Sequence, residues 1–294
     1  MRFLSIINPF ASRGRALKLL PRLQSIVART NHTFDWRVTQ SSDEMQAVIA
    51  DAAQSGIDGV ILVGGDGTVS SALPALLSTG LPLGVIPCGR GNDFVRNAGL
   101  PLNPLHAAVY PDRPEIRSID IPAANGRPFG SIACLGLDAR INELANKPVK
   151  YFPGRSAFVY ATLKAMRHFE PFDVTVTLDG HVWHSTIMMA AIANGPSYGG
   201  GMKIAPKANM EDGRLNLCIV RRTGKWTMLK EFPGVFKGKH TQHPNVISLS
   251  AKAVTITSET DQKVFADGEN IGQLPLTCSI GEHHLNIMQP MCND

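Results

Sequence analysis

The sequence has few cysteines, and their spacing forms no framework. There are five, at positions 88, 134, 218, 278 and 292, which is an odd number and includes no Cys-x-x-Cys pair. This pattern argues against a disulfide-stabilised fold and against a zinc site built on thiolates. We therefore expect reduced cysteines, most of them buried as small apolar residues.

Long hydrophobic runs are also lacking. The apolar run at residues 1–7 is too short for a signal peptide and ends at Asn8-Pro9. The apolar stretch at residues 187–193 is bounded by polar residues or glycine and is shorter than a membrane span. Since internal repeats and low-complexity segments are missing too, we expect a globular, cytoplasmic protein.

The remaining composition is that of an ordinary globular protein. Its 294 residues are 44% hydrophobic and 18% charged, which is enough for two cores of ordinary domain size. The formal net charge of +5 would suit anionic substrates, a membrane surface or nucleic acid. Composition does not choose among these partners.

Basic residues are densest between positions 221 and 240, where aromatic residues lie among them. Lysines and aromatic side chains together can seat a segment at a lipid headgroup layer. The simpler interpretation is a solvated helix and loop with the aromatic side chains turned inward, and the pattern alone favours it. The basic residues are Arg221, Arg222, Lys225, Lys230, Lys237 and Lys239, and the aromatic residues are Trp226, Phe232 and Phe236.

The first 120 residues alternate between strand and helix patterns. Such alternation predicts a parallel sheet covered on both faces, with ligands at the carboxyl ends of the strands. Three loops, 8–14, 64–68 and 87–93, would then meet at one edge. The expected strands are 3–7, 34–38, 60–63 and 83–86, and the expected helices are 16–28, 43–53 and 69–77. The apolar face expected for the first helix comprises Leu17, Leu20, Leu23 and Val27.

The most informative motif is the glycine-rich turn Gly64-Gly65-Asp66-Gly67-Thr68, which ends a buried strand. Glycines let the backbone approach a phosphate closely, and the following helix adds its positive N-terminal end. A carboxylate repels phosphates unless a divalent cation lies between the two or unless Asp66 handles a proton. The turn thus indicates metal-assisted phosphoryl chemistry. A plain strand-to-helix turn, capped by Asp66 or Thr68, is the open alternative.

After about Pro122 the patterns become those of a β-rich domain. Residues 172–178 alternate, Asp179-Gly180 predicts a hairpin turn, and the strand pattern resumes at residues 182–187. The Asp-Gly pairs at 212–213 and 267–268 adjoin two more strand patterns, 215–220 and 264–266. We expect a sandwich or sheet-rich domain with a helical insertion around residues 156–169.

Five blocks of residues follow one another in a recognisable order. They are Asn8-Pro9 with Ser12 and Gly14, the turn 64–68, residues 87–94, Gly199-Gly200-Gly201 followed by Pro206 and Asp212-Gly213, and Asp267-Gly268-Glu269. In order and spacing they resemble the diacylglycerol kinase-like lipid kinases, which include soluble bacterial members and, more distantly, sphingosine and ceramide kinases. The turn alone would be weak evidence, because NAD kinases carry it and phosphofructokinases carry a close version. The resemblance spans nearly the whole chain.

This resemblance implies the fold class and the nucleotide site. An α/β, parallel-sheet nucleotide domain would cover residues 1–122, and a β-rich, sandwich-like lipid-substrate domain would cover residues 123–294. The active site would lie in the cleft between them, and the extreme C-terminus is a candidate to pack back on the first domain. By resemblance the ATP contacts are Asn8, Ser12, Thr39 and the turn 64–68. For Thr39, a cap or turn ahead of Ser41 is the alternative.

Residues 87–94 depart from the family pattern, whose commoner form has threonine where this chain has Arg90. The guanidinium could pair with a nucleotide phosphate in bidentate fashion, or with Asp93 as a structural ion pair. Asn92 is a candidate nucleotide contact. Asn92 and Asp93 are equally candidates for the N-cap of a helix through Phe94.

Phosphoryl transfer to an alcohol needs in-line placement, charge neutralisation by a metal and a group that accepts the hydroxyl proton. On sequence alone, residues 267–269 form a hairpin turn. The resemblance implies instead that an acidic residue of this turn is the base, and by register that residue is Glu269. Asp267 would orient the base or a metal-bound water. Asp66 is the alternative base, as assigned to the matching aspartate in sphingosine kinases.

A structural metal site is implied in the second domain. Similar bacterial kinases bind Mg²⁺ or Ca²⁺ there, and the matching ligands are Asp212 with the carbonyls of Asn209 and Arg214. The chemistry of hard cations permits such a site. A simple β-turn over residues 211–214 is the alternative.

The sequence therefore indicates an ATP- and Mg²⁺-dependent lipid kinase of phospholipid biosynthesis, peripherally bound to a membrane. It would phosphorylate a hydroxyl of a diacylglycerol-like or related lipid; nucleic acid is not an expected partner, and a homodimer is compatible with the sequence. One alternative is a soluble-substrate kinase related to NAD kinase, which leaves blocks 87–94 and 267–269 unexplained. Another is a non-catalytic nucleotide-binding regulatory module, against which the intact acidic residues Asp66, Asp267 and Glu269 argue.

Overall fold

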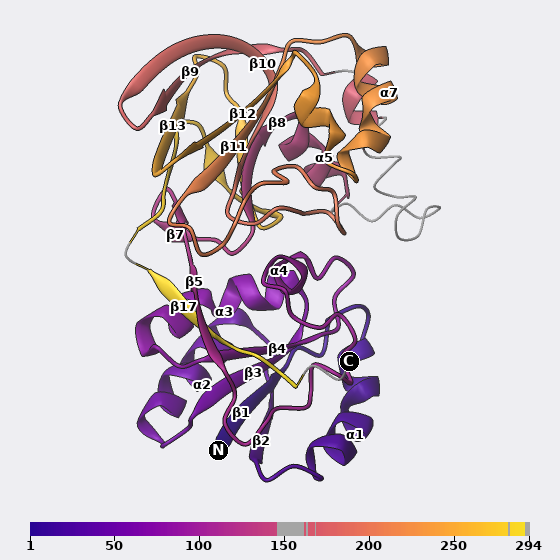
Figure 1. Ribbon diagram of the computed structural model, residues 1–294, viewed down its shortest axis with the longest axis vertical. Helices are drawn as coiled ribbons and strands as arrows, with labels where there is room; N and C mark the ends of the chain where they lie inside the picture. Colours follow the sequence, from indigo (N-terminus) through magenta and orange to yellow (C-terminus); the bar gives the residue numbers. More distant parts are fainter. Residues whose placement is uncertain (146–161, 163, 168, 282, 292–294) are drawn as a thin grey trace. The chain divides into compact units, whose positions relative to one another are not determined.

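The computed structural model describes residues 1–145, 162, 164–167, 169–281 and 283–291. The chain forms two compact units (Figure 1): unit 1 comprises Met1–Ile121 with Glu282–Asp294, and unit 2 comprises Pro122–Gly281. Each unit has its own sheet and its own core. Most of the helical insertion expected over residues 156–169 lies outside the described residues, although 164–167 are helical.

Unit 1 is built on a six-stranded sheet in the order β2-β1-β3-β4-β17-β5. Neighbouring strands are parallel from β2 to β17, and only β5 is antiparallel, at the edge. The strands are β1 (Arg2–Ile7), β2 (Thr33–Val38), β3 (Gly59–Gly64), β4 (Leu83–Pro87), β5 (Ile116–Asp120) and β17 (His284–Met288). The helices are α1 (Arg15–Val27), α2 (Ser42–Gln54), α3 (Asp66–Thr79) and α4 (Asp93–Asn97). The predicted parallel-sheet α/β class is confirmed.

Helices cover both faces of this sheet, as predicted. Alternate residues of the central strands, such as Phe3 and Ile61, pack with the buried face of α1, while α2 and α3 pack together on the other side (Figure 1). The expected face of α1 was wrong by one residue. Ala16 is buried and Leu17 is 42% exposed. The reason is that Ala16 precedes the buried Leu23 by seven residues, a spacing that places both on the same face of the helix.

Unit 2 is built on an eleven-stranded sheet, which confirms the predicted β-rich second domain. Its strands are β6 (Ala123–Ala124), β7 (Arg127–Pro128), β8 (Ile132–Gly136), β9 (Phe172–Leu178), β10 (His181–Ala193), β11 (Leu215–Arg221), β12 (Val246–Ala251), β13 (Ala253–Thr257), β14 (Lys263–Ala266), β15 (Glu269–Gln273) and β16 (Leu276–Ser279). Its helical elements are α5 (Leu137–Ala145), α7 (Lys225–Val235) and the 3-10 helix η1 (Lys239–Gln242). The hairpins at Asp179-Gly180 and Asp267-Gly268 are confirmed.

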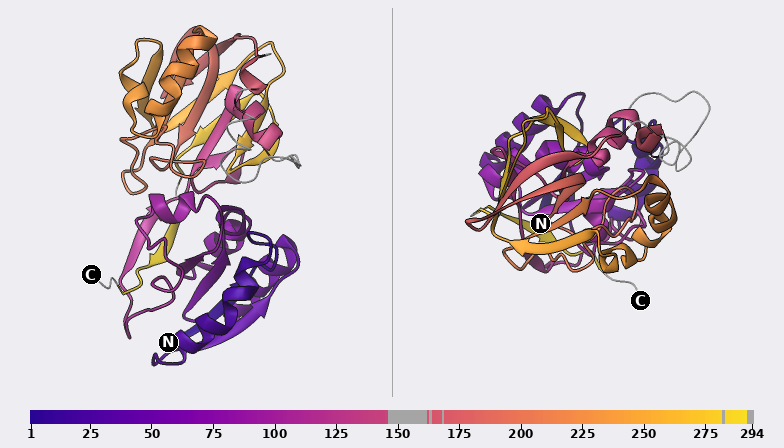
Figure 2. Two further views of the ribbon diagram at one scale, coloured as in Figure 1. Left: turned by 90° about the vertical axis from the view of Figure 1, so that its right-hand side faces the viewer. Right: turned by 90° about the horizontal axis from the view of Figure 1, so that it is seen from above.

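The second half of the central strand β10, residues 187–193, is buried on both of its faces. Ala190 and Ile192 belong to one apolar cluster, and Met189 and Ala191 belong to the other. The second cluster includes side chains of α5 and α7, which lie on the outside of the sheet (Figure 2). These two helices therefore enclose an apolar layer against β10.

Two expectations from composition can be compared with the described residues. Cys88, Cys134, Cys218 and Cys278 are free and buried, as predicted. Among the described helices, none combines the length and the apolar character needed to cross a bilayer.

Candidate active site

Three loops of unit 1 meet at the carboxyl edge of its sheet, as the strand order requires. β1, β3 and β4 are adjacent and parallel, so the segments that follow them lie side by side. The Asn8 amide nitrogen donates to the Thr68 hydroxyl at 3.0 Å, which joins the loop after β1 to the glycine-rich turn. The backbone N–H of Cys88 donates to the carbonyl of Gly64 at 2.7 Å, which joins that turn to the loop after β4.

The glycines of the turn have different structural roles. A Cβ on Gly65 would lie 2.7 Å from the Cα of Gly89, so this glycine is required where the two loops touch. A Cβ on Gly67 would meet no atom within 4 Å, and this residue is exposed. The first N–H groups of a helix have no intrahelical acceptor, so those of Asp66 and Gly67 can receive an anion.

Thr68 is buried and acts inside the turn. Its hydroxyl accepts the backbone N–H of Gly65 at 3.4 Å as well as the amide of Asn8. This geometry fits the capping interpretation of Thr68. The Thr68 side chain therefore holds the two loops in place, and the backbone of the turn is left for a phosphate.

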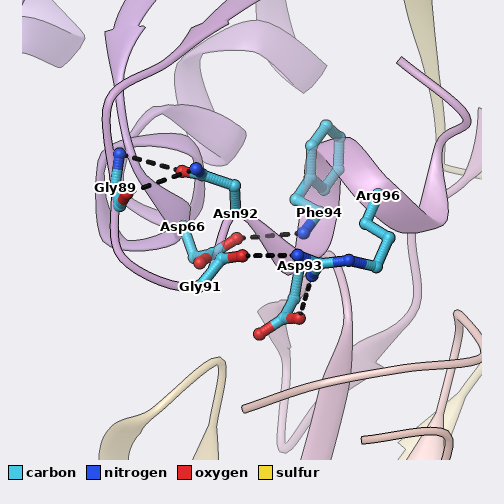
Figure 3. Close-up of polar contacts among 7 residues, drawn as sticks. All are labelled: Asp66, Gly89, Gly91, Asn92, Asp93, Phe94 and Arg96. Atoms are coloured by element: carbon cyan, nitrogen blue, oxygen red, sulfur yellow. Dashed lines mark hydrogen bonds and ion pairs between the residues drawn. The ribbon is translucent and has the colours of Figure 1, made fainter. Parts of the chain in front are cut away.

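Asp66 links the turn to the next helix (Figure 3). Its carboxylate accepts the backbone N–H of Phe94, the second residue of α4, at 2.9 Å. Arg96 donates to the Asp93 carboxylate at 2.6 Å and to the Gly91 carbonyl at 3.1 Å. A Cβ on Gly91 would lie 2.9 Å from one oxygen of Asp66 and 2.9 Å from one oxygen of Asp93. Two carboxylates thus face the same small space.

The structure changes the interpretation of residues 89–93. Asn92 precedes α4, but its side chain closes a turn by bonding to the N–H and carbonyl of Gly89, at 2.8 and 3.2 Å (Figure 3). Asn92 occupies the N-cap position of α4, as predicted, but makes no side-chain capping bond there, and the carboxylate that accepts the N–H of Phe94 is that of Asp66. The pairing to Asp93 that was considered for Arg90 is made by Arg96. Arg90 is exposed and has no hydrogen bond or ion pair within the described residues.

Ser12 and Thr39 both lie at this edge of the sheet, but their local structures differ. Ser12 has a positive φ of 46° and is followed by two more left-handed residues, Arg13 and Gly14, which turn the chain into α1. Thr39 is buried, and its N–H donates to the carbonyl of the last residue of β1. The cap of α2 is Ser41, whose hydroxyl accepts the N–H of Glu44 at 3.1 Å.

In unit 2, Asp267 is fully engaged by the backbone. Its carboxylate accepts the N–H groups of Gly130, Ser131 and Ile132 at 2.6, 2.9 and 3.1 Å. The residue itself has a positive φ of 47° in the β14–β15 hairpin. Asp267 therefore fixes the segment that leads into β8, which is the geometry of a positioning residue.

Glu269 is placed differently from Asp267. It is the first residue of β15, its side chain is 43% exposed, and it forms an ion pair with Arg127 of β7. Its carboxylate is thus reachable from solvent and is oriented by a cation. The two acids of this hairpin thus differ in their partners, which are a side-chain cation for Glu269 and backbone N–H groups for Asp267.

Unit 2 also contains an apolar cavity of about 90 Å³. Its wall includes Leu137 and Tyr198, with side chains of β10 and α7. Beside it, the buried carboxylate of Asp138 accepts the Tyr198 hydroxyl at 2.8 Å. Burial raises the pKa of Asp138 from 3.8 to about 6, although hydrogen bonds from Tyr198 and Cys134 oppose this. The buried Asp138–Tyr198 pair therefore adjoins the cavity through Tyr198, which forms part of its wall.

The loop expected to hold a structural metal forms two side-chain turns. The Asn209 side chain accepts the N–H of Glu211 at 3.2 Å, and Asp212 accepts the N–H of Arg214 at 3.0 Å. The Arg214 side chain bonds to Ser250 of β12. In the described part of the chain, no group of three or more metal-ligating His, Cys, Asp or Glu side chains occurs. The metal site at Asp212 stays a prediction.

Comparisons with known proteins identify the family. A model of the diacylglycerol kinase catalytic domain matches residues 2–124, and a model of the YegS C-terminal NAD kinase beta sandwich-like domain matches residues 131–289. A diacylglycerol kinase of Mycobacterium tuberculosis is 33% identical over 97% of this chain and 94% of its own length. The chain belongs to the diacylglycerol kinase family. It is thus a lipid kinase, as the motifs predicted.

Other members of the diacylglycerol kinase family agree with this assignment. A diacylglycerol kinase of Staphylococcus carnosus is 26% identical over 97% of this chain and 94% of its own length. The crystal structure of a diacylglycerol kinase from Bacillus anthracis has a TM-score of 0.72 and 23% identity over 98% of this chain and 96% of that one. The last comparison supports the fold.

Sequence reasoning missed two groups of this kinase. One is the Asp93–Arg96 pair beside Asp66, and the other is Asp138 with Tyr198. The Asp93–Arg96 pair could have been predicted from the sequence, because an Asp and an Arg three residues apart on a helix are neighbours. The second had a weaker indication, since Asp138 follows the glycine that ends β8, and its partner lies 60 residues away.

Proposed function

We propose that this kinase transfers the γ-phosphate of ATP to a hydroxyl of a diacylglycerol-like or related lipid at a membrane surface. The observation that carries the proposal is the junction of the three loops at Asn8, Gly65 and Gly89. It leaves unpaired helix N–H groups and an exposed Gly67 at the carboxyl edge of a parallel sheet, where nucleotide phosphates bind in such folds.

The acidic pair beside this junction fits a divalent cation. Asp66 and Asp93 each direct one oxygen to the space beside Gly91, and magnesium commonly binds to one or two carboxylates with phosphate oxygens and water. When bound, such an ion supplies neutralisation of the charge that develops on the transferred phosphoryl group. Arg96 balances part of the negative charge of the pair.

The cavity of unit 2 supports a lipid acceptor. Its apolar wall suits an acyl chain. A soluble acceptor such as a dinucleotide would leave the apolar wall unmatched. This favours a lipid alcohol over the substrate of an NAD kinase.

Glu269 is our proposed base, and Asp66 is the alternative. Glu269 is partly exposed and held by Arg127, whereas Asp267 is fixed by three backbone N–H groups and serves to position the hairpin. Asp66 combines a helix-capping bond with a free second oxygen, so it can hold a cation or accept a proton.

The decisive experiment supplies labelled ATP and Mg²⁺ with four acceptors in separate reactions. These are diacylglycerol, ceramide and a sphingoid base in detergent micelles, and NAD in buffer. We expect a labelled lipid phosphate, and the Asp66→Asn variant should give little of it. If only NAD is labelled, the protein is a soluble-substrate kinase and the lipid proposal is wrong. If the protein binds nucleotide but labels no acceptor, a non-catalytic regulatory module is favoured.

A further inference from the structure

The helix α7 presents its largest side chain to solvent. Trp226 is 84% exposed, and Phe236, which follows the helix, is 43% exposed. The interpretation that the aromatic residues of this segment turn inward is therefore wrong for these two. An exposed tryptophan on a helix is typical of contact with a membrane interface or with another protein.

The charge of the whole chain is concentrated around this helix. Residues 221–240 contain six lysines and arginines and one glutamate, so this segment carries a net charge equal to the +5 of the full sequence. All six basic residues are exposed. Lys230 and Lys237 make no side-chain hydrogen bond or ion pair within the described residues. The surface of α7 is thus uncompensated positive charge around an exposed indole.

The two faces of α7 have different partners. Trp226, Lys230 and Pro233 are exposed at the helical spacing i, i+4 and i+7, so they form the outer face. Met228 and Phe232 form part of the wall of the apolar cavity. One helix therefore separates a basic, tryptophan-bearing surface from the cavity that we assign to the lipid.

We propose that the outer face of α7 is the surface by which this kinase docks on an anionic lipid bilayer, with Trp226 in the headgroup layer. The inference rests on the proposed function, because docking here brings the cavity wall to the source of its lipid. An anionic bilayer fits better than a protein partner, since every exposed charged residue of segment 221–240 is positive.

Vesicle binding of the full chain tests the proposal directly. Neutral phosphatidylcholine vesicles are compared with vesicles that contain phosphatidylglycerol, at low and high salt, by co-sedimentation and by Trp fluorescence. Binding should require the anionic lipid, weaken with salt and shift the emission to the blue. Trp226→Ala should weaken binding by at least about tenfold, because a large apolar side chain leaves the interface. The double variant Lys230→Gln/Lys237→Gln should weaken it by about 30-fold, or about fivefold per charge.

Two matched controls lie elsewhere in the same unit. Val182→Ser removes another exposed apolar side chain, 59% exposed on β10, and Lys252→Gln removes an exposed charge between β12 and β13. Both should bind vesicles like the wild type. All variants should phosphorylate micellar lipid at wild-type rates, since micelles deliver substrate without a bilayer.

Each outcome has a definite meaning. If the α7 variants bind anionic vesicles as tightly as the wild type and the controls, the docking surface lies elsewhere and the inference is overturned. It is also overturned if size-exclusion chromatography shows dimers that Trp226→Ala dissociates, because the tryptophan then faces a second copy. A wild type that binds vesicles through α7 but phosphorylates no lipid even in micelles would refute the proposed function and leave the docking surface standing.

Discussion

The carboxylate of Asp66 accepts the backbone N–H of Phe94 at 2.9 Å, so the acid of the glycine-rich turn caps the helix that begins in the next loop. The contact gives one side chain two tasks. Its first oxygen holds α4 in place, and its second faces the space shared with Asp93. The structural and the chemical role can be separated by substitution.

Asp66→Asn keeps an oxygen that can accept the N–H of Phe94 but loses the charge. We expect kcat to fall by roughly two to four orders of magnitude with little change in the melting temperature. Asp66→Ala should show the same loss of activity and an additional loss of about 1 kcal/mol in the free energy of unfolding, because the cap is gone. Steady-state kinetics and urea unfolding measure the two effects. An active Asp66→Asn protein would reduce Asp66 to its capping role.

Gly67 and Gly65 form a matched pair for testing the phosphate site. Gly67→Ala places a methyl group in open space, so the fold should be unaffected while the affinity for ATP falls by about tenfold or more. Gly65→Ala places a methyl group 2.7 Å from the Cα of Gly89 and should lower stability as well. Isothermal titration with ATP and thermal unfolding distinguish the two. Unchanged ATP affinity in Gly67→Ala would remove the turn from the nucleotide site.

The two acids of the β14–β15 hairpin should respond differently to amide substitution. Glu269→Gln is expected to lower kcat by roughly two to four orders of magnitude while folding and ATP affinity stay near normal, because an amide cannot accept the proton. Asp267→Asn should instead lower the free energy of unfolding by about 1–3 kcal/mol, since its amide cannot accept all three N–H groups.

A magnesium titration completes this comparison. Extra Mg²⁺ should not restore the Asp267→Asn variant, because its defect is in the backbone segment 130–132. Recovery of activity with Mg²⁺ would return Asp267 to a metal-bound water. If Glu269→Gln keeps near-full activity while Asp66→Asn loses it, the base belongs to the glycine-rich turn.

Stability should depend on pH through Asp138. Its pKa is raised to about 6 in the folded protein from an ordinary value of 3.8, so between these values the folded state holds a proton that the unfolded state has lost. The contribution of Asp138 to the free energy of unfolding is therefore largest below about pH 4. It falls by about 3 kcal/mol in total as the pH rises to about 6. Urea unfolding at pH 4.5 and 7 measures the difference.

Asp138→Asn provides the control for this pH dependence. The variant has no charge to bury, so it should lack this fall in stability between pH 4.5 and 7. Its amide oxygen can still accept the Tyr198 hydroxyl. A wild-type slope in the variant would assign the pH dependence to other groups.

Local patterns were sufficient to predict the loops that meet in unit 1. Parallel order follows from strand-helix alternation, so the amino-acid sequence alone places Asn8 and Gly64–Thr68 at one edge of the sheet. The contacts that define the chemistry were not predictable in this way. Phe94 lies 28 residues from Asp66, and Gly130 lies 137 residues from Asp267. No spacing or periodicity encodes such pairs, because tertiary packing alone brings them together.

The outer face of α7 illustrates a different limit. The sequence showed basic and aromatic residues together, but whether Trp226 turned inward depended on the layer beneath the helix. That layer is already filled by Met228, Leu229 and Val235, which pack against the cluster on β10. Trp226 does not belong to that cluster and lies on the outer face of the helix.

The sheet of unit 1 can be completed only when its last strand, β17, has been synthesised. This strand lies between β4 and β5, yet it is made after every residue of unit 2. On the ribosome, the sheet of unit 2 can therefore form before β17 is made. At that stage the edge of β4 that β17 will occupy is unpaired, and β5 has no neighbouring strand in the sheet of unit 1. Trimming the chain before His284 would remove the strand that joins these two.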